Sequence, residues 1–249
     1  MLRRILARLW RHRLLVFLSL LLLLVLVFLL FRYWRPAATP QLLRLRSWFN
    51  DPAAHAHWAV NAGERCGNAL MLIPTNGYVG FGWDDSFRPG HRHSGLDIFS
   101  PDGAVNVTPV LAAYDGYLTR EAEWKSTIIL RHPAFPAVPA AGLPAGEQIW
   151  TYYTHMASRD GSQSFVASTF PPGSHDVFVK AGTLLGYQGN WAGSQWQFTG
   201  LHLHFSVVKS TADGSYADER EIANTYDPIP FLGLTQSEEG VWVCKEMTR

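Results

Sequence analysis

Charged residues are scarce in this chain, at 16% of 249 residues, and its first 35 positions contain no acidic residue. Seven of the 21 Lys and Arg residues fall in those positions, which leaves 14 basic against 20 acidic groups and a net charge of about −6 over the remainder. Binding to phosphate backbones needs a clustered basic excess on the folded part, so this balance excludes nucleic acid as a partner. A hydrophobic share of 47% also excludes disorder over the whole length.

Cysteine is rarer still, with only Cys66 and Cys244 present. Neither has a second cysteine within a few positions, which excludes a cysteine-rich structural zinc site. In an oxidising compartment the two could pair and tie the end of the chain to the start of its main domain. The alternative is two unpaired buried thiols.

An apolar run from Leu14 to Phe31 is interrupted only by Ser19. As a helix it would be about 27 Å long at roughly 1.5 Å per residue, just enough to cross a bilayer. A cleaved signal peptide is the alternative, but its apolar region is usually shorter and precedes a small-x-small cleavage site. Here the run ends in Arg32-Tyr33-Trp34-Arg35-Pro36, which is suited to a headgroup anchor. Because five arginines precede the run, we expect a single-pass membrane protein with a cytoplasmic N-terminus and an extracytoplasmic body.

Changes in composition divide the chain into four predicted segments. Residues 1–35 form the basic segment and membrane anchor, and residues 36–61 form a juxtamembrane linker that is partly helical. In the linker, apolar residues have helical spacing over 41–49, and Asp51 could cap a short helical segment running toward Val60. The main domain covers residues 62–235, and residues 236–249 form a tail that Cys66 and Cys244 could tie down.

Short apolar runs broken by Gly, Pro, Asn and Asp fill the main domain, which predicts an all-β fold with a mainly antiparallel sheet. The expected strands include residues 70–74, 110–114, 126–130, 148–153, 177–179, 183–187 and 203–208. The stretches 132–146 and 159–175 are predicted to be long loops, which usually bind something or are mobile.

Three local patterns carry histidines that could do chemistry. The first is His91-Arg92-His93-Ser94-Gly95-Leu96-Asp97. Imidazole nitrogen and carboxylate oxygen are ordinary zinc ligands. On a fully extended strand, His93 and Asp97 would share a face but lie about 13 Å apart. They can meet at one ion only if the backbone bends between them, and Gly95 could allow this through positive φ or close approach.

The second pattern is His202-Leu203-His204-Phe205. Alternation along a strand sends both imidazoles to one face and Leu203 and Phe205 to the other. Both histidines could bind one metal, or one could bind while the other faces the substrate, and spacing alone does not choose.

The third pattern, Tyr152-Tyr153-Thr154-His155, ends a strand-like segment. A histidine at such a position suits proton transfer, because its ordinary pKa of about 6.5 is near the working pH.

Taken in order, His93-x-Gly95-x-Asp97, Tyr153-x-His155 and Gly200-x-His202-Leu203-His204-Phe205 resemble the lysostaphin-type zinc endopeptidases, also called the LytM or M23 family. Connecting segments add to the resemblance, which covers about residues 73–208: Gly80-Phe81-Gly82, Ala112-Ala113-Tyr114-Asp115-Gly116, Val179-Lys180-Ala181-Gly182, Gly186 and Gly189-Asn190.

The resemblance implies a zinc site formed by His93, Asp97 and His204, with His155 and His202 as the catalytic pair. It also implies a compact antiparallel sheet with the metal in a groove walled by loops. Three protein ligands would leave a position for a water whose pKa the ion lowers. One of the two catalytic histidines would take the proton, and which one is left open.

Members of the family mostly cut peptide bonds in peptidoglycan stems or cross-links, so the resemblance implies a membrane-anchored zinc metalloendopeptidase facing the cell wall. One alternative is a catalytically silent envelope protein of the same fold that binds the wall or activates another hydrolase. Another is a peptidase that acts on secreted proteins or peptides. No protein partner is identified.

Three departures from the family pattern bear on the site. His91 makes a second His-x-His, although only His93 stands four positions before Asp97. Position 206 is Ser where the family often has an acidic residue beside the metal-binding histidine. Residues 191–198 are longer and more aromatic than the usual turn, so Trp191 and Trp196 could line the groove or simply pack. The remaining histidines are expected at the surface: His12, His55, His57, His132 and His175.

Overall fold

The computed structural model describes residues 2–33, 39–85, 90–194, 196, 197 and 199–244. These residues form two compact units, Met1–Leu43 and Arg44–Arg249. Residues 44–61 and 236–244, which we expected to be linker and tail, therefore lie within the larger unit.

The first unit contains α1 (Leu2–Tyr33), which carries the expected apolar run. Its residues 12–29 are long and apolar enough to cross a membrane, and none of this segment is buried inside the protein. A signal sequence would meet the same criterion, so the membrane span stays a prediction. The expected anchor and spacer at residues 34–38 lie outside the described residues.

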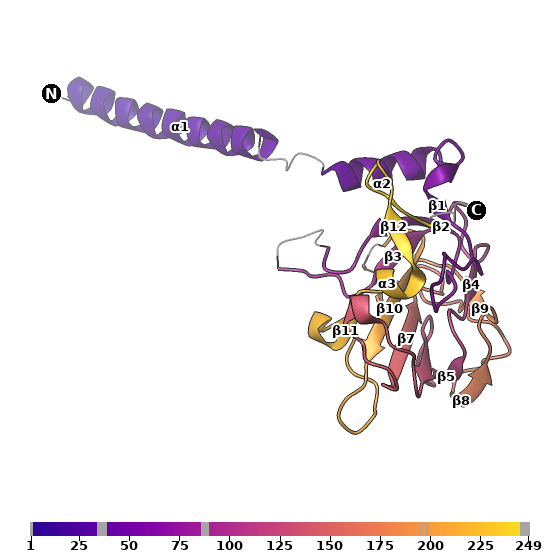
Figure 1. Ribbon diagram of the computed structural model, residues 1–249. Helices are drawn as coiled ribbons and strands as arrows, with labels where there is room; N and C mark the ends of the chain where they lie inside the picture. Colours follow the sequence, from indigo (N-terminus) through magenta and orange to yellow (C-terminus); the bar gives the residue numbers. More distant parts are fainter. Residues whose placement is uncertain (1, 34–38, 86–89, 195, 198, 245–249) are drawn as a thin grey trace. The chain divides into compact units, whose positions relative to one another are not determined.

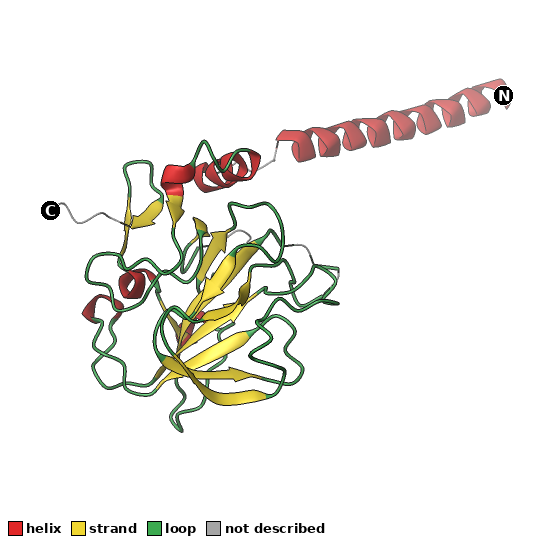
Figure 2. Ribbon diagram, turned by 90° about the vertical axis from the view of Figure 1, so that its right-hand side faces the viewer, coloured by secondary structure: helices red, strands yellow, loops and turns green. Residues whose placement is uncertain are grey.

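Antiparallel strands build the second unit (Figures 1 and 2). Among the described residues, nine strands form one sheet in the order β1-β2-β3-β10-β7-β6-β5-β8, with β11 beside β10. Every strand pairing in the described part of this sheet is antiparallel, so the expected all-β, mainly antiparallel fold is confirmed. The strands of this sheet are β1 (Ala59–Val60), β2 (Gly77–Phe81), β3 (Leu96–Phe99), β5 (Gly116–Arg120), β6 (Ile128–His132), β7 (Ile149–Thr154), β8 (Ser174–Val179), β10 (His202–Lys209) and β11 (Thr225–Tyr226).

Two further strand pairs and several short helices complete the set of described elements. Strand β4 pairs with β9, and β12 pairs with β13. The bounds of these elements are β4 (Pro109–Leu111), β9 (Leu184–Tyr187), β12 (Leu234–Gln236), β13 (Trp242–Cys244), α2 (Pro40–Asn50), α3 (Ile229–Leu232) and the 3-10 turns Ala56–Trp58, Pro139–Ala141 and Ile222–Asn224.

Strand β10 lies between β3 and β7. Its residues alternate between apolar and polar side chains, a pattern that favours a strand with one buried face. Leu203, Phe205 and Val207 are fully buried in the main core, while His202, His204 and Ser206 alternate with them on the opposite face. The expected separation of the two imidazoles from the apolar layer is thus confirmed. Burying each large apolar side chain stabilises the fold by about 1.5–3 kcal/mol.

The N- and C-terminal parts of the second unit pack against the sheet. Trp48 of α2 is buried beside Tyr78 of β2 and donates its indole N–H to the carbonyl of Ser100 at 3.2 Å. Cys66 and Cys244 form a disulfide that joins positions 178 residues apart in the chain. The expected helix over 41–49 is present as α2.

Two local expectations need correction. The segment after Asp51 reaches only a 3-10 turn, because Ala59 and Val60 instead extend and pair with β2. Residues 70–74 form no strand, since the backbone N–H groups of Met71, Leu72 and Ile73 donate to three separate segments.

Candidate metal centre

The histidine and aspartate positions meet because their strands are neighbours. On β10, His204 pairs with Asp97 of β3 on one side and with Thr154 of β7 on the other. His155 follows β7 directly, and His93 stands just before β3. Strand pairing therefore gathers residues from three distant parts of the sequence.

The bend between His93 and Asp97 depends on Gly95. Gly95 is not among the glycines with positive φ. A Cβ at this position would instead clash with the carbonyl oxygen of Phe205 and with Oγ of Ser206. Of the two roles considered for Gly95, close approach is the one found: the chain passes directly over β10 before β3 begins.

His93 is held in place at its backbone as well as its ring. Its N–H donates to the carbonyl of Asp85 at 2.9 Å, and its carbonyl accepts from Asp84 at 2.8 Å. Its ring Nδ1 lies 2.8 Å from the carbonyl oxygen of Gly82. The side chain of His93 is only 5% exposed, so these contacts fix a buried ring rather than a surface one.

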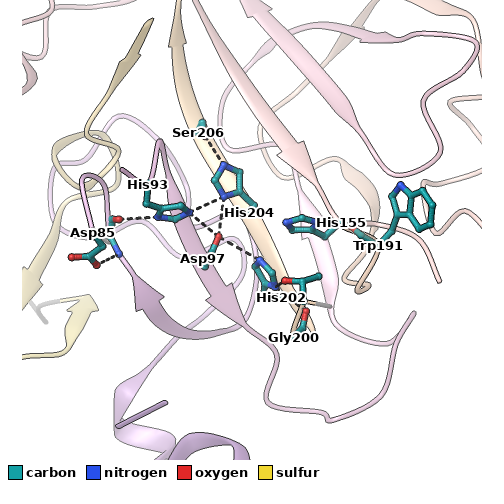
Figure 3. Close-up of polar contacts among 11 residues, drawn as sticks. Asp85, His93, Asp97, His155, Trp191, Gly200, His202, His204 and Ser206 are labelled. Carbon is teal, nitrogen blue, oxygen red and sulfur yellow. Dashed lines mark hydrogen bonds and ion pairs between the residues drawn. The ribbon is translucent and has the colours of Figure 1, made fainter. Parts of the chain in front are cut away.

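Three possible ligand atoms converge at one point (Figure 3). Nε2 of His93 lies 3.0 Å from Oδ1 of Asp97 and 3.0 Å from Nδ1 of His204. Nδ1 of His204 lies 2.9 Å from the same Asp97 oxygen. Each atom is thus about equally far from the other two.

The hydrogen-bond partners of His93 and His204 indicate where the protons on their rings lie. A carbonyl only accepts, so Nδ1 of His93 carries the proton and a neutral His93 presents a lone pair at Nε2. Nε2 of His204 lies 2.9 Å from Oγ of Ser206; when Nε2 donates to this hydroxyl, Nδ1 of His204 also presents a lone pair. With the Asp97 carboxylate, three acceptors then face one another, and they need a proton or a metal cation between them.

The pKa directions agree with this requirement. Burial disfavours a charge on His93, but the Asp97 carboxylate outweighs it and raises the pKa of His93. Burial would raise the pKa of Asp97, but His202 and His93 hold it well below its usual range. Burial is the largest influence on His204 and lowers its pKa. The cluster therefore stabilises positive charge between a carboxylate and largely dehydrated rings.

The donor set fits zinc. Two imidazole nitrogens and one carboxylate oxygen are ligands that Zn²⁺ accepts, and three such ligands are typical of catalytic rather than structural sites. The hydroxyl of Ser206 contacts the far nitrogen of His204 at 2.9 Å and so helps to orient its ring.

Two further imidazoles flank the cluster. The ring of His155 lies 4.5 Å from the ring of His202 and 6.1 Å from that of His204, measured between centroids. Nε2 of His202 is 3.4 Å from Oδ1 of Asp97, and its ring stacks on Phe99 at 4.8 Å. The five predicted site residues therefore lie together. His93, Asp97 and His204 form the cluster, and His155 and His202 flank it.

Backbone carbonyls orient both flanking rings. Nδ1 of His202 lies 2.8 Å from the carbonyl oxygen of Gly200, and Nδ1 of His155 hydrogen-bonds the carbonyl of Trp191. Each neutral ring is then protonated at Nδ1, which leaves Nε2 able to accept a proton. His155 also has a φ of 74°, a conformation that is uncommon for residues other than glycine and frequent at functional sites.

The pKa of His155 differs from that of an ordinary histidine. Burial, followed by the neighbouring His202 and His204, lowers its pKa to about 3. The ring is therefore neutral at physiological pH. Its Nε2 therefore presents a lone pair and can accept a hydrogen bond.

The cluster opens into a groove of about 750 Å³. His91 lies in the groove wall with its ring 6.4 Å from that of His93, outside the three-atom cluster. Neither Trp191 nor Trp196 is among the described groove-lining residues: the Trp191 ring is under Lys125 at 5.2 Å, and Trp196 is 84% exposed. Of the two readings of Trp191, packing is the one found.

Sequence reasoning missed the groups that orient the site. The carbonyls of Gly82, Gly200 and Trp191 carry no side-chain signal, so only the fold reveals them. It also missed His132, which we expected at the surface but which is only 2% exposed. Its ring nitrogens contact the carbonyl of Asp115 and the hydroxyl of Thr151, and these two partners make its burial possible.

No protein-family model matches this chain, and no curated protein gives a significant match. Its solved structural neighbours include LytM, lysostaphin and M23 peptidase domains, and also a chain of the SpoIIIAH–SpoIIQ complex. The catalytic domain of the antimicrobial peptidase lysostaphin from Staphylococcus simulans is 22% identical, with 67% of this chain and 93% of that chain covered and a TM-score of 0.37.

Two other neighbours are of the same kind. A protein from Ruminococcus gnavus, described provisionally as the glycyl-glycine endopeptidase LytM, is 21% identical with a TM-score of 0.35, and the match covers 55% of this chain but only 45% of that one. A variant catalytic domain of the prophage-encoded M23 protein EnpA from Enterococcus faecalis is 18% identical, with 64% and 95% covered and a TM-score of 0.32. At these values the likenesses carry no argument about the activity of this chain.

Proposed function

We propose that this chain is a membrane-anchored zinc metalloendopeptidase that hydrolyses peptide bonds in peptidoglycan stems or cross-links. The observation that carries the proposal is the convergence of His93 Nε2, Asp97 Oδ1 and His204 Nδ1 within about 3 Å of one another in an open groove. His155 and His202 lie beside them with Nε2 available on each ring. This is the arrangement that metal-assisted hydrolysis needs.

In this proposal, His93, Asp97 and His204 hold the ion. Bound zinc would supply a Lewis acid for the scissile carbonyl and activate a water molecule. His155 and His202 handle protons: each ring is fixed through Nδ1 to a backbone carbonyl, so Nε2 is the atom that takes a proton and later returns it to the leaving amine. The ring that has taken the proton can also donate a hydrogen bond to the developing oxyanion.

The substrate class follows from the setting of the groove. An uncleaved α1 would hold the second unit at the outer face of the membrane, where cell-wall peptides are the abundant polymeric substrate. The net negative charge after residue 35 argues against an anionic polymer such as nucleic acid. Both points support a wall peptide as the substrate.

The activity test uses the full chain in detergent, loaded with zinc, on purified sacculi and on casein in parallel. New amino termini released from sacculi alone support the proposal. Release from casein as well favours a peptidase for secreted proteins. No turnover of either substrate, with tight sacculus binding, favours a catalytically silent wall-binding protein. His155→Ala serves as the matched inactive variant, because among the described residues the His155 ring makes no hydrogen bond to the three ligand atoms of His93, Asp97 and His204.

The membrane anchor has its own test. Membranes from cells that express the full chain are washed at alkaline pH and treated from outside with protease. After the wash, the proposal expects the chain to stay in the membrane fraction at its full length. After the protease treatment, it expects the second unit to be digested. A shortened, soluble chain would indicate a cleaved signal instead.

A further inference from the structure

The groove wall carries charges that are not balanced. Besides Asp97, its charged lining residues are Arg92, Glu219, Arg220 and Glu221. Both arginines are already paired with aspartates that do not line the groove. Arg92 contacts Asp84 at 2.5 and 2.8 Å, and Arg220 contacts Asp218 at 2.9 and 2.7 Å.

The two glutamates have no such partner. Among the described residues, no ion pair within 4.0 Å involves Glu219 or Glu221. Asp218 is the main cause of the raised pKa of Arg220, and the two glutamates contribute less. This part of the groove wall is therefore anionic, even though two arginines line the same groove.

Glu219 is also held in a fixed position. Its Oε2 accepts a hydrogen bond from the hydroxyl of Tyr216 at 3.0 Å. The Tyr216 ring stacks on Tyr152 at 6.4 Å and meets the Trp150 ring edge-on at 5.7 Å. Because burial and the charge of Glu219 raise the pKa of both tyrosines, Tyr216 keeps the proton that it donates.

The same aromatic stack connects the glutamate to the metal cluster. The Tyr152 ring lies 6.1 Å from the ring of His204, edge to face. Glu219 and the cluster therefore belong to one groove wall, and a peptide bound at the cluster would pass close to the carboxylate. Glu219 also hydrogen-bonds the side chain of Tyr152. A carboxylate can accept about four hydrogen bonds, so Glu219 can still accept one from a ligand, and among the described residues no hydrogen bond occupies the carboxylate of Glu221.

We propose that Glu219, assisted by Glu221, forms a subsite for a primary ammonium group of the substrate peptide, either a free amino terminus or the side chain of a diamino acid. The inference rests on the proposed function for its substrate class. A primary ammonium has three N–H donors, and charge-assisted hydrogen bonds to an oriented, partly dehydrated carboxylate are the stronger kind. Glu219 is thus a specificity-determining residue rather than a catalytic one.

The test compares native sacculi with sacculi whose free amines have been acetylated by acetic anhydride. Binding is measured by co-sedimentation of the full chain, treated with a chelator so that no turnover occurs. We expect wild-type protein to bind the acetylated sacculi about tenfold more weakly, as loss of a hydrogen-bonded charge pair implies. Glu219→Gln, which is nearly isosteric, should remove this preference, and Tyr216→Phe should reduce it.

The matched control is Glu123→Gln, which removes one negative charge at an exposed position between β5 and β6 that does not line the groove. It should keep the wild-type preference. Equal binding of wild-type protein to both preparations would overturn the ammonium subsite, and so would an unchanged preference in Glu219→Gln. A preference for native sacculi that depends on Glu219, without cleavage after zinc is restored, would support the subsite while the proposed hydrolase activity fails.

Discussion

His132 gives a quantitative prediction about how pH affects the stability of the fold. The residue is 2% exposed, and its ring nitrogens lie 2.7 Å from the carbonyl oxygen of Asp115 and 2.9 Å from Oγ1 of Thr151. Burial lowers the pKa of His132 to about 4, against smaller opposing effects of Asp115. The folded protein therefore resists protonation of a ring that the unfolded chain protonates near pH 6.5.

The sign follows from which state binds more protons. Between about pH 6.5 and pH 4 the unfolded chain carries the extra proton, so the free energy of unfolding falls as the pH falls through this window. A difference of about 2.5 pKa units corresponds to about 3 kcal/mol in total, of which about 2 kcal/mol is lost between pH 7.5 and pH 5. Above pH 6.5 the contribution is fully present.

The assay is denaturant unfolding of the chelator-treated full chain in detergent at pH 7.5 and pH 5, for wild type and His132→Gln. The other histidines titrate in both proteins, so subtracting the two pH dependences isolates His132. We expect the variant to lose about 2 kcal/mol less than wild type over this interval. Equal losses in the two proteins would refute the assignment of a depressed pKa to this buried ring.

Three further predictions concern the site and its frame. Ser206→Ala should weaken zinc binding about tenfold in a chelator competition, because the far nitrogen of His204 loses its partner, while Ser206→Thr should largely retain it. Gly95→Ala should lower the free energy of unfolding by about 1–3 kcal/mol, because the added Cβ meets β10, and should reduce the zinc content measured after dialysis. Replacing Cys66 and Cys244 together by Ser should cost about 2–5 kcal/mol in denaturant unfolding, since the disulfide closes a very long loop. An unchanged midpoint would show that this bond does not constrain the unfolded chain.

Much of the site could be predicted from the sequence because its side chains form short, ordered motifs. The alternation in β10 required His202 and His204 to share a face, and the structure has them there. Spacing could not bring His93 to Asp97, since an extended chain separates them; the resemblance supplied that step and the close approach at Gly95 explains it.

The parts that sequence reasoning missed depend on contacts between distant backbone groups. The burial of His132 is possible because the carbonyl of Asp115, in the bend before β5, and the hydroxyl of Thr151, on β7, reach its ring. Residues 70–74 have a strand-like composition, yet their N–H groups donate to separate segments rather than to one neighbouring strand. Composition shows which residues are apolar but not where their hydrogen-bond partners lie. The sequence therefore placed His132 at the surface and a strand at residues 70–74.

We propose that His93, Asp97 and His204 bind one catalytic zinc ion, with His202 beside it but not binding it. Elemental analysis of the purified full chain and two variants tests this most directly. We expect about one zinc per chain in wild type, almost none in His204→Ala, and about one in an inactive His202→Ala. Zinc lost from His202→Ala but kept by His204→Ala, or no zinc in wild type grown with the metal, would contradict the account.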